Sequence, residues 1–401
     1  MKTTIGTHCT VTSSKRFHLS ERAESGVPFF CSKQIIQLEN GEIPSDYDHI
    51  TNEHFRDIQI KYGVPSAGDL LITTRGTYGI PYIYKECDCF YFADGNLTWL
   101  KDFDDCLSSH YLYYWFKSYE GQKKIDAIAK GTAQKAVPIA LIKDLQLSLP
   151  PISQQKRIAS ILSAYDDLIE NNRRQIKLLE EAAQRLYREW FVELRFPGHE
   201  GVKVVDGVPE GWTVTTASEV TNVLRRGISP NYDETARLSV ISQKCIRQYM
   251  VDMNQVRRQS KSFDSSMGLL DSDTVICSTG TGTLGRVGKV FGNHPNCTFD
   301  SHVTLVRTNG TVGKHYLNLR MYELREYFDS CKTGSTNQTE LSRSIVQNVK
   351  VYIADSHTQK IFEKIEEAYH QKMMICQHQI QLLTETRDRL LPKLMNGEME
   401  V

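Results

Sequence analysis

One stretch of the sequence has the pattern of a nucleotide-binding loop. Gly280-Thr-Gly-Thr-Leu-Gly285 has the spacing G-x-G-x-x-G after a predicted strand, and Asp300 lies about 20 residues further on. In a dinucleotide-binding fold, these glycines let the N-terminus of a following helix approach a pyrophosphate. Here Arg286 to Phe291 follows, and its alternation is typical of a strand. We therefore predict a glycine-rich β-turn at this loop.

Other catalytic and metal-binding patterns are absent from the sequence. It contains no P-loop, no G-x-S-x-G and no H-E-x-x-H. Leu149-Pro-Pro-Ile152 lacks the polar residue that precedes the prolines in the Asp-Pro-Pro-aromatic motif of amino-methyltransferases. Among the 10 cysteines, Cys87 and Cys89 form the one close pair, and the 12 histidines show no metal-ligand spacing. We therefore expect reduced cysteines, no metal site and no catalytic centre.

Loops rich in basic, hydroxyl and glycine residues suggest a different chemistry. Lys and Arg neutralise phosphates, Ser, Thr and glycine N–H groups position a nucleic-acid backbone, and Arg, Asn and Gln can read base edges. Such loops are often plain solvated turns, but here they recur at matched positions in two parts of the chain. The predicted DNA-binding residues are Ser14, Lys15, Arg16, Thr74, Arg75, Thr77, Tyr78, Thr132, Gln134, Lys135, Arg225, Arg226, Ser278, Thr279, Thr281, Lys332, Ser335, Thr336, Asn337 and Gln338.

The elements that must position these loops form an internal repeat. Asp69-Leu-Leu-Ile-Thr-Thr-Arg-Gly76 aligns with Asp273-Thr-Val-Ile-Cys-Ser-Thr-Gly280, and His110-Tyr-Leu112 aligns with His315-Tyr-Leu317. Further along, Gln155-Lys156 aligns with Gln359-Lys360. Because the matches keep their order, we infer one unit of about 200 residues that is used twice.

Each repeat is predicted to have a β-rich globular part followed by a long helix. The predicted segments are 1–151 and 199–353 for the globular parts, and 152–198 and 354–401 for the helices. In the first globular part, strands are expected at 70–74 and 80–84 around the turn Arg75–Gly79, with one helix over 107–130. Ser153 is the expected N-cap of the first long helix, with Pro197-Gly198 closing that segment. Ser356–Gln359 is the expected capping box of the second, and Pro392 is expected to kink or interrupt that helix near Leu391.

Both helical segments carry apolar residues in steps of four and three, which is typical of a coiled coil. At ~1.5 Å per residue, each helix would be about 50 Å long, and two such helices in one chain can pair, with Asn172 helping to fix their register. The predicted interface residues are Ile158, Leu162, Tyr165, Ile169, Asn172, Ile176, Leu179 and Leu186 in the first helix and Phe362, Tyr369, Met373, Ile380, Leu383 and Leu390 in the second.

The composition fits a globular protein of several domains. The chain has 401 residues, 48 Lys and Arg against 48 Asp and Glu, and no apolar run of the ~18 residues that a membrane span needs. Its start lacks the pattern of a signal peptide, so we expect a cytoplasmic protein. A net charge of zero requires that any DNA-binding surface arise from an uneven distribution of charge.

Four segments give the sequence a family resemblance. Leu149-Pro-Pro-Ile-Ser-Gln-Gln-Lys-Arg-Ile158, which continues to Glu170, resembles the central conserved region of specificity subunits of type I restriction-modification systems. Phe191-Val-Glu-Leu-Arg-Phe-Pro-Gly198, Pro209-Glu-Gly-Trp212 and Leu390-Leu-Pro-Lys-Leu-Met-Asn-Gly-Glu398 resemble the same family. The layout covers essentially the whole chain, although Ala354-Asp-Ser-His-Thr-Gln-Lys-Ile361 departs from the usual Pro-Pro start of the second helix.

The resemblance implies an α+β fold with two globular mixed α/β target-recognition domains. These alternate with two long helices that pair as an antiparallel coiled coil, and the repeat is pseudo-twofold. It further implies a bacterial or archaeal, non-catalytic subunit that binds double-stranded DNA, each domain reading one half of a split site across a helical spacer.

The resemblance also implies partner subunits. Two methyltransferase subunits would use S-adenosylmethionine, and up to two restriction subunits would use ATP and Mg, with no cofactor in this chain. Arg173, Arg174 and Glu181 are candidates for methyltransferase docking. The alternatives are a coiled-coil scaffold that binds protein and, less favoured, a self-contained nucleotide-dependent enzyme using the Gly280–Gly285 loop.

Overall fold

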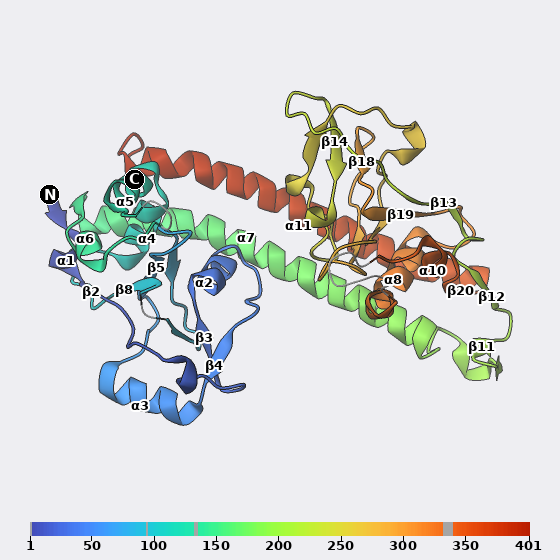
Figure 1. Ribbon diagram of the computed structural model, residues 1–401, viewed down its shortest axis with the longest axis horizontal. Helices are drawn as coiled ribbons and strands as arrows, with labels where there is room; N and C mark the ends of the chain where they lie inside the picture. The colour runs from blue at the N-terminus through green and yellow to red at the C-terminus, as the bar shows by residue number, and fades with distance from the viewer. Residues whose placement is uncertain (1, 94, 132–134, 332–339) are drawn as a thin grey trace. The chain divides into compact units, whose positions relative to one another are not determined.

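Short apolar runs of the sequence become the buried strands of two similar sheet systems. The computed structural model describes residues 2–93, 95–131, 135–331 and 340–401. It divides into unit 1, Met1–Arg173 with Gln379–Val401, and unit 2, Arg174–His378. Each of the two long helices contributes one part to each unit (Figure 1).

Unit 1 contains three sheets, with strand orders β2-β8-β5-β6, β4-β3-β7 and β1-β9. Central strand β5 has the sequence Leu-Leu-Ile-Thr, and all four of its residues are buried. The strands are β1 (Lys2–Thr4), β2 (Thr10–Thr12), β3 (Val27–Phe30), β4 (Asp48–Ile50), β5 (Leu70–Thr73), β6 (Pro81–Ile83), β7 (Tyr91–Phe92), β8 (Leu97–Lys101) and β9 (Gln146–Ser148). The helices before the long one are α1 (Ile5–His8), α2 (Ser32–Glu39), α3 (Asn52–Tyr62), α4 (Ser109–Lys117), α5 (Tyr119–Ile128) and α6 (Ile139–Lys143).

Unit 2 repeats these sheets, with strand orders β13-β19-β16-β17, β15-β14-β18 and β12-β20, and adds the small pair β10-β11. The strands are β10 (Val204–Val205), β11 (Val208–Pro209), β12 (Thr213–Thr216), β13 (Thr221–Arg226), β14 (Leu238–Ile241), β15 (Arg257–Gln259), β16 (Thr274–Cys277), β17 (Val287–Lys289), β18 (Cys297–Phe299), β19 (Val303–Thr308) and β20 (Lys350–Ile353). The shorter helices are α8 (Lys314–Glu323), α9 (Arg325–Ser330) and α10 (Arg343–Gln347).

The two units share their strand directions as well as their strand order. In unit 1, β3 pairs antiparallel with β4 and parallel with β7, and in unit 2, β14 pairs antiparallel with β15 and parallel with β18. The aligned glutamines also make the same bond, because Gln155 Nε2 donates to Pro150 O at 2.9 Å and Gln359 Nε2 donates to Ala354 O at 2.8 Å. The internal repeat predicted from the sequence is therefore confirmed.

The glycine-rich loop lies between two paired strands. β16 precedes Gly280–Gly285 and β17 follows it, and the two strands pair antiparallel with Ile276 opposite Val287. A strand follows the loop where a dinucleotide fingerprint would need a helix, as the alternation in the sequence predicted. The equivalent turn of unit 1 joins β5 to β6 in the same way.

The predicted helix over 107–130 is in fact two helices, α4 and α5, which meet at Ser118. Ser118 has extended backbone angles, and its hydroxyl donates to Trp115 O at 2.6 Å while accepting from the Gly121 N–H at 3.2 Å. A Cβ at Gly121 would lie 2.0 Å from Trp115 O, so the turn requires glycine there. The apolar pattern predicted the helical content, but this local cap was missed.

Two long helices, α7 (Ile152–Tyr187) and α11 (Ser356–Met395), contribute to the cores of both units. In unit 1, Asp166 of α7 forms an ion pair with Arg387 of α11 at 2.5 Å, and Leu394 shares a core with Ile158 and Leu162. In unit 2, the rings of Trp190 and Phe362 lie 5.7 Å apart. Within each unit the residue numbers rise along α7 as they fall along α11, so the two helices lie antiparallel. The predicted interface positions are all buried or half-buried.

The ends of the long helices differ from the expected caps. α7 begins at Ile152, so Ser153 lies inside its first turn. The α-helix ends at Tyr187, well before Pro197, and continues as a π-helical segment over Arg188–Val192. Leu194 then adopts a left-handed conformation, with φ 58°. For α11, Asp355 is the cap, because its Oδ1 accepts from the backbone N–H groups of His357 and Thr358 at 2.9 and 3.0 Å.

Two features inside the helices also differ from expectation. α11 continues through Pro392 to Met395. The buried Asn172 donates from Nδ2 to Leu168 O of its own helix at 3.0 Å. That bond satisfies the amide locally, so the structure gives no support to a role for Asn172 in fixing the register.

All ten cysteines are free, as the sequence predicted. None of the helices that the structure describes is both long enough and apolar enough to span a membrane.

A charged network is buried beneath α8 in unit 2. Lys289 is fully buried, and its ammonium donates to His315 Nδ1 at 2.7 Å. Nδ1 therefore acts as an acceptor, and Nε2 carries the proton that it donates to Glu367 Oε2 at 2.9 Å. Burial and the neighbouring Lys289 charge lower the pKa of His315 to about 3. The imidazole is thus held neutral.

This network predicts an acid-sensitive contribution to the stability of unit 2. Below an ordinary histidine pKa of about 6.5, His315 takes up a proton in the unfolded chain but not in the folded one. The free energy of unfolding therefore decreases as the pH is lowered. His315→Gln keeps a neutral acceptor and donor and should lose less unfolding free energy between about pH 7 and about pH 5. The unfolding free energy at each pH is measured by urea titration of the full chain, with pulse labelling of unit 2 peptides to follow the unfolding of that unit.

The matched control is His110→Gln, because His110 is the exposed counterpart of His315 in the repeat. It should keep the acid sensitivity of the parent chain. An equal loss of stability in the parent chain and in His315→Gln would contradict the assignment.

Candidate nucleic-acid interface

Three loops of unit 2 meet at one end of its main sheet. The Ser278 N–H, just after β16, donates to His302 O at 2.8 Å, and the Leu341 N–H donates to Ser278 O at 2.8 Å. Thr279 forms a β-bridge with Glu340, and a 2.7 Å hydrogen bond joins its hydroxyl and His302 Nδ1. The segments around 226, 278 and 340 are therefore held as one surface.

Arg226, at the end of β13, fastens these loops together. Its guanidinium donates to Leu341 O at 2.9 Å and forms an ion pair with Glu340 at 2.6 Å. Gly227 follows, and only glycine fits there, because a Cβ would lie 1.9 Å from Phe299 O. Arg226 is half-buried, and its guanidinium is occupied by these contacts within unit 2.

The same surface contains an open hollow with a basic lining. Arg225, Arg226, Glu340, Ser342 and Arg343 line a space of ≈ 710 Å³. Arg225 and Arg343 are exposed, whereas Glu340 is engaged with Arg226. Exposed guanidinium groups beside Ser342 form a surface that can receive phosphate oxygens.

Electrostatics around the hollow favour an anion. Its lining contains three arginines and one acidic residue, Glu340, which is paired with Arg226. Asp264 also interacts electrostatically with Arg225. The lining of the hollow therefore carries a net positive charge.

Unit 1 brings its predicted loops together in the equivalent way. The Thr74 N–H donates to Asn96 O, and the Val137 N–H donates to Thr74 O, at 2.8 and 2.9 Å. Arg75 forms a β-bridge with Ala136, as Thr279 does with Glu340. Ser13 Oγ donates to Leu97 O at 3.0 Å, which places the segment before Lys15 and Arg16 beside the same strand end.

The exposed side chains of this unit 1 surface are Arg75, Thr77 and Lys135, with Lys15 and Arg16 on the adjoining segment. The Lys15 ammonium lies 4.6 Å from the centre of the Tyr62 ring. Tyr78 is half-buried, and its hydroxyl donates to Asp126 Oδ1 at 3.0 Å. Lys130, which was not among the predicted site residues, is exposed and bridges to Ala136 through its backbone.

Several of the predicted residues have side chains inside the domains. Ser278 is 1% exposed, and its hydroxyl lies 2.6 Å from that of Thr304. Thr74 is 3% exposed, and Ser14 is also buried. These three residues are therefore not available on the surface. Thr281 is exposed and Thr279 is half-buried, and both stay predictions.

Part of the predicted interface lies outside the described residues. These predictions are Thr132 and Gln134 in the first repeat and Lys332, Ser335, Thr336, Asn337 and Gln338 in the second. The structure does describe Lys135 and Glu340, the residues that follow the two segments. The predicted methyltransferase-docking residues Arg173, Arg174 and Glu181 lie on α7; Arg174 and Glu181 are exposed and Arg173 is half-buried.

Sequence reasoning missed Arg343. It stands alone between serines in Leu-Ser-Arg-Ser, without the glycines that marked the other loops. The repeat gives no signal for it either. Leu341 corresponds to Val137, because the N–H of each donates to the residue after the central strand, and Arg343 then corresponds to the apolar Ile139.

Comparison with known proteins agrees with this architecture. Residues 4–181 match the family model described as the type I restriction modification DNA specificity domain. The chain is 25% identical over 390 residues to the type I restriction enzyme MjaIX specificity subunit of Methanocaldococcus jannaschii, covering 94% of this chain and 87% of that protein. It is 30% identical over 181 residues to a putative type I restriction enzyme specificity subunit of Haemophilus influenzae, covering 45% and 43% of the two chains.

A solved structure shows the same fold. The crystal structure of the type I restriction-modification S subunit from M. genitalium matches with a TM-score of 0.59 and 16% identity, covering 98% of this chain and 95% of that one. The repeated sheet topology, the two long helices and these matches together support one conclusion. Residues 4–181 match the specificity-domain family, and over nearly its whole length the chain is similar to type I restriction-modification specificity subunits.

Proposed function

We propose that this chain is the DNA sequence-specificity subunit of a type I restriction-modification complex, and that it reads a bipartite site. Residues 1–151 would read one half-site and residues 199–353 the other, with the α7–α11 pair as the spacer. The single observation that carries the proposal is the convergence of equivalent loops in both units, at Thr74–Ala136 and at Thr279–Glu340. A binder duplicated inside one chain fits a site with two separate parts.

Within each unit, the proposed role of each basic residue follows from how far its side chain is exposed to solvent. Arg225 and Arg343 in unit 2, and Arg75, Lys15 and Lys135 in unit 1, would contact DNA because their charged groups reach solvent. Arg226 would position the loops rather than bind DNA strongly, because Glu340 and Leu341 already occupy its guanidinium.

The chain would act without a catalytic centre of its own, in keeping with the specificity subunits to which it is similar. Methylation would come from two methyltransferase subunits that use S-adenosylmethionine. Cleavage, where it occurs, would come from restriction subunits that use ATP and Mg. The exposed α7 residues Arg174 and Glu181 are candidate docking positions for the methyltransferase subunits.

The first prediction concerns the pattern of methylation. Cells that carry this chain with its methyltransferase should contain methylated adenines within two short constant sequences separated by a gap of constant length and free sequence. Genome-wide mapping of methylated adenine measures this directly. A continuous recognition sequence, or methylation that persists when the chain is deleted, would contradict the proposal.

The second prediction concerns Arg343. Arg343→Met should weaken DNA binding by the assembled complex across all sequences, and should lower the slope of log affinity against log salt by about 1, because one phosphate contact is lost. Lys350→Met is the control, since Lys350 is exposed on β20 and does not line the hollow. Equal slopes in the two variants would exclude Arg343 from the interface.

The third prediction separates Arg226 from its neighbour Arg225. Arg226→Met should release residues 340 and 341 and raise the hydrogen-exchange rate of the Leu341 amide, because the guanidinium bonds to both residues are lost. Arg225→Met should leave that exchange rate unchanged while reducing the salt slope. Mass-spectrometric exchange on the full chain tests this, and equal exchange in the two variants would refute the positioning role.

A further inference from the structure

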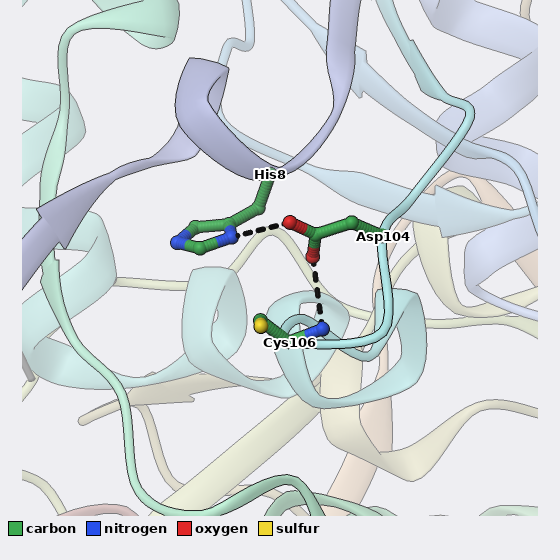
Figure 2. A group of neighbouring side chains, drawn as sticks. All are labelled: His8, Asp104 and Cys106. Carbon is green, nitrogen blue, oxygen red and sulfur yellow. Dashed lines mark hydrogen bonds and ion pairs between the residues drawn. The ribbon is translucent and has the colours of Figure 1, made fainter.

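Three side chains with metal-binding atoms meet in unit 1, away from the proposed DNA surface. His8 ends the short helix α1, and Asp104 and Cys106 lie in the loop between β8 and α4. Figure 2 shows them facing one small region, with His8 reaching in from α1 and the other two from the loop. Their ligand atoms all lie within 4.8 Å of one another, and no other such group occurs among the residues that the structure describes.

The contacts of His8 fix its imidazole on both sides. Nδ1 lies 2.8 Å from Asp104 Oδ2, and Nε2 lies 2.9 Å from Thr3 Oγ1. The His8 side chain is 4% exposed, whereas that of Asp104 is 44% exposed. Asp104 Oδ1 accepts the backbone N–H of Cys106 at 2.9 Å, which keeps the thiol next to the carboxylate. One buried ligand is thus oriented, and two ligands on its solvent side are accessible.

The Thr3 hydroxyl allows the imidazole to become a metal ligand without a change of position. In the metal-free arrangement, Nδ1–H donates to Asp104 and Nε2 accepts from the Thr3 hydroxyl. When the single ring proton moves from Nδ1 to Nε2, the Nδ1 lone pair becomes available to a metal and Nε2 donates to Thr3 Oγ1, because a hydroxyl serves as donor or acceptor. A histidine that binds a metal through one nitrogen and donates a hydrogen bond through the other is the usual arrangement in zinc sites.

We propose that His8 Nδ1, an Asp104 carboxylate oxygen and the Cys106 thiolate form a site for Zn²⁺. A nitrogen, oxygen and sulfur ligand set suits this ion, which prefers four ligands in a tetrahedron. Bonds of about 2.0–2.3 Å require the ligand atoms to lie roughly 3.3–3.7 Å apart. His8 Nδ1 and the Asp104 carboxylate, now 2.8 Å apart, must therefore separate slightly, which the 44% exposed Asp104 side chain can do. The exposed Cys106 side chain must rotate inward, and its exposure leaves it room to do so. Water would complete the fourth position.

The site would act on the structure of unit 1 rather than on a reaction. The Cys106 carbonyl accepts from Gln155 Nε2 at 2.9 Å, and the Ser108 N–H donates to Gln155 Oε1 at 3.0 Å. The loop that carries two of the ligands is therefore bound to the first turn of α7, while the third ligand follows strand β1. A bound ion would link the N-terminal segment, this loop and the start of the long helix.

Cobalt provides a direct test, because Co²⁺ bound to a thiolate absorbs in the near ultraviolet and occupies zinc sites with similar geometry. The reduced full-length chain, purified without a histidine tag, should bind cobalt stoichiometrically with a thiolate band that zinc removes. Cys106→Ser should abolish the band. The control Cys87→Ser/Cys89→Ser removes two other exposed cysteines and should retain it.

Thr3→Val tests the role assigned to the hydroxyl. It keeps the β-branched shape and the ligands but removes the partner of Nε2, so zinc affinity should fall by about ten-fold. Zinc should also protect Cys106, but not Cys87 or Cys89, from alkylation in the parent chain, a measurement that needs no variant. Absence of a thiolate band, loss of the band in the Cys87/Cys89 variant, or equal alkylation with and without zinc would each overturn the proposal.

Discussion

The burial of one face of α7 and one face of α11 is the constraint on which both units depend. In unit 1, Ile158, Leu162 and Leu394 belong to the same apolar core as the β5 residues Leu70 and Ile72. In unit 2, Phe191 contacts Phe362, Tyr316 and Trp212, with ring centres 4.6 to 5.5 Å apart. Each full burial of a large apolar side chain contributes about 1.5–3 kcal/mol. The globular parts are therefore built onto the helices, and neither sheet system has a complete core without them.

Because apolar contacts of the helices and sheets hold each unit together, the polar turns at the ends of β5 and β16 are available for the binding role that we propose. Their backbones are held by bonds such as Leu341 N–H to Ser278 O, while side chains such as Arg343 and Arg75 extend into solvent. The zero net charge of the chain is compatible with such a surface, because three arginines and one acidic residue, Glu340, line the hollow of unit 2 and Glu340 is paired with Arg226.

The features that the sequence predicted well are those that recur or have a period. The repeat of about 200 residues, the heptad seams and the strand-turn-strand at Gly280–Gly285 each involve many residues, so local exceptions did not obscure them. Features that depend on one side chain were missed. The break at Ser118 depends on one hydroxyl and on Gly121, the cap of α11 is Asp355 rather than Ser356, and Asn172 satisfies its amide within its own helix. His8 and Asp104 are 96 positions apart, so no motif spacing could have brought them together.

The central claim is that each globular part reads its own half-site, and exchange of one part tests it most directly. Residues 1–151 would be replaced by the corresponding segment of another type I specificity subunit, keeping α7 and the apolar residues that face it. Methylated adenines would then be mapped in cells that also carry the methyltransferase. The account predicts that one half-site changes while the other half-site and the gap length stay the same. A change in both half-sites, or in neither, would contradict it.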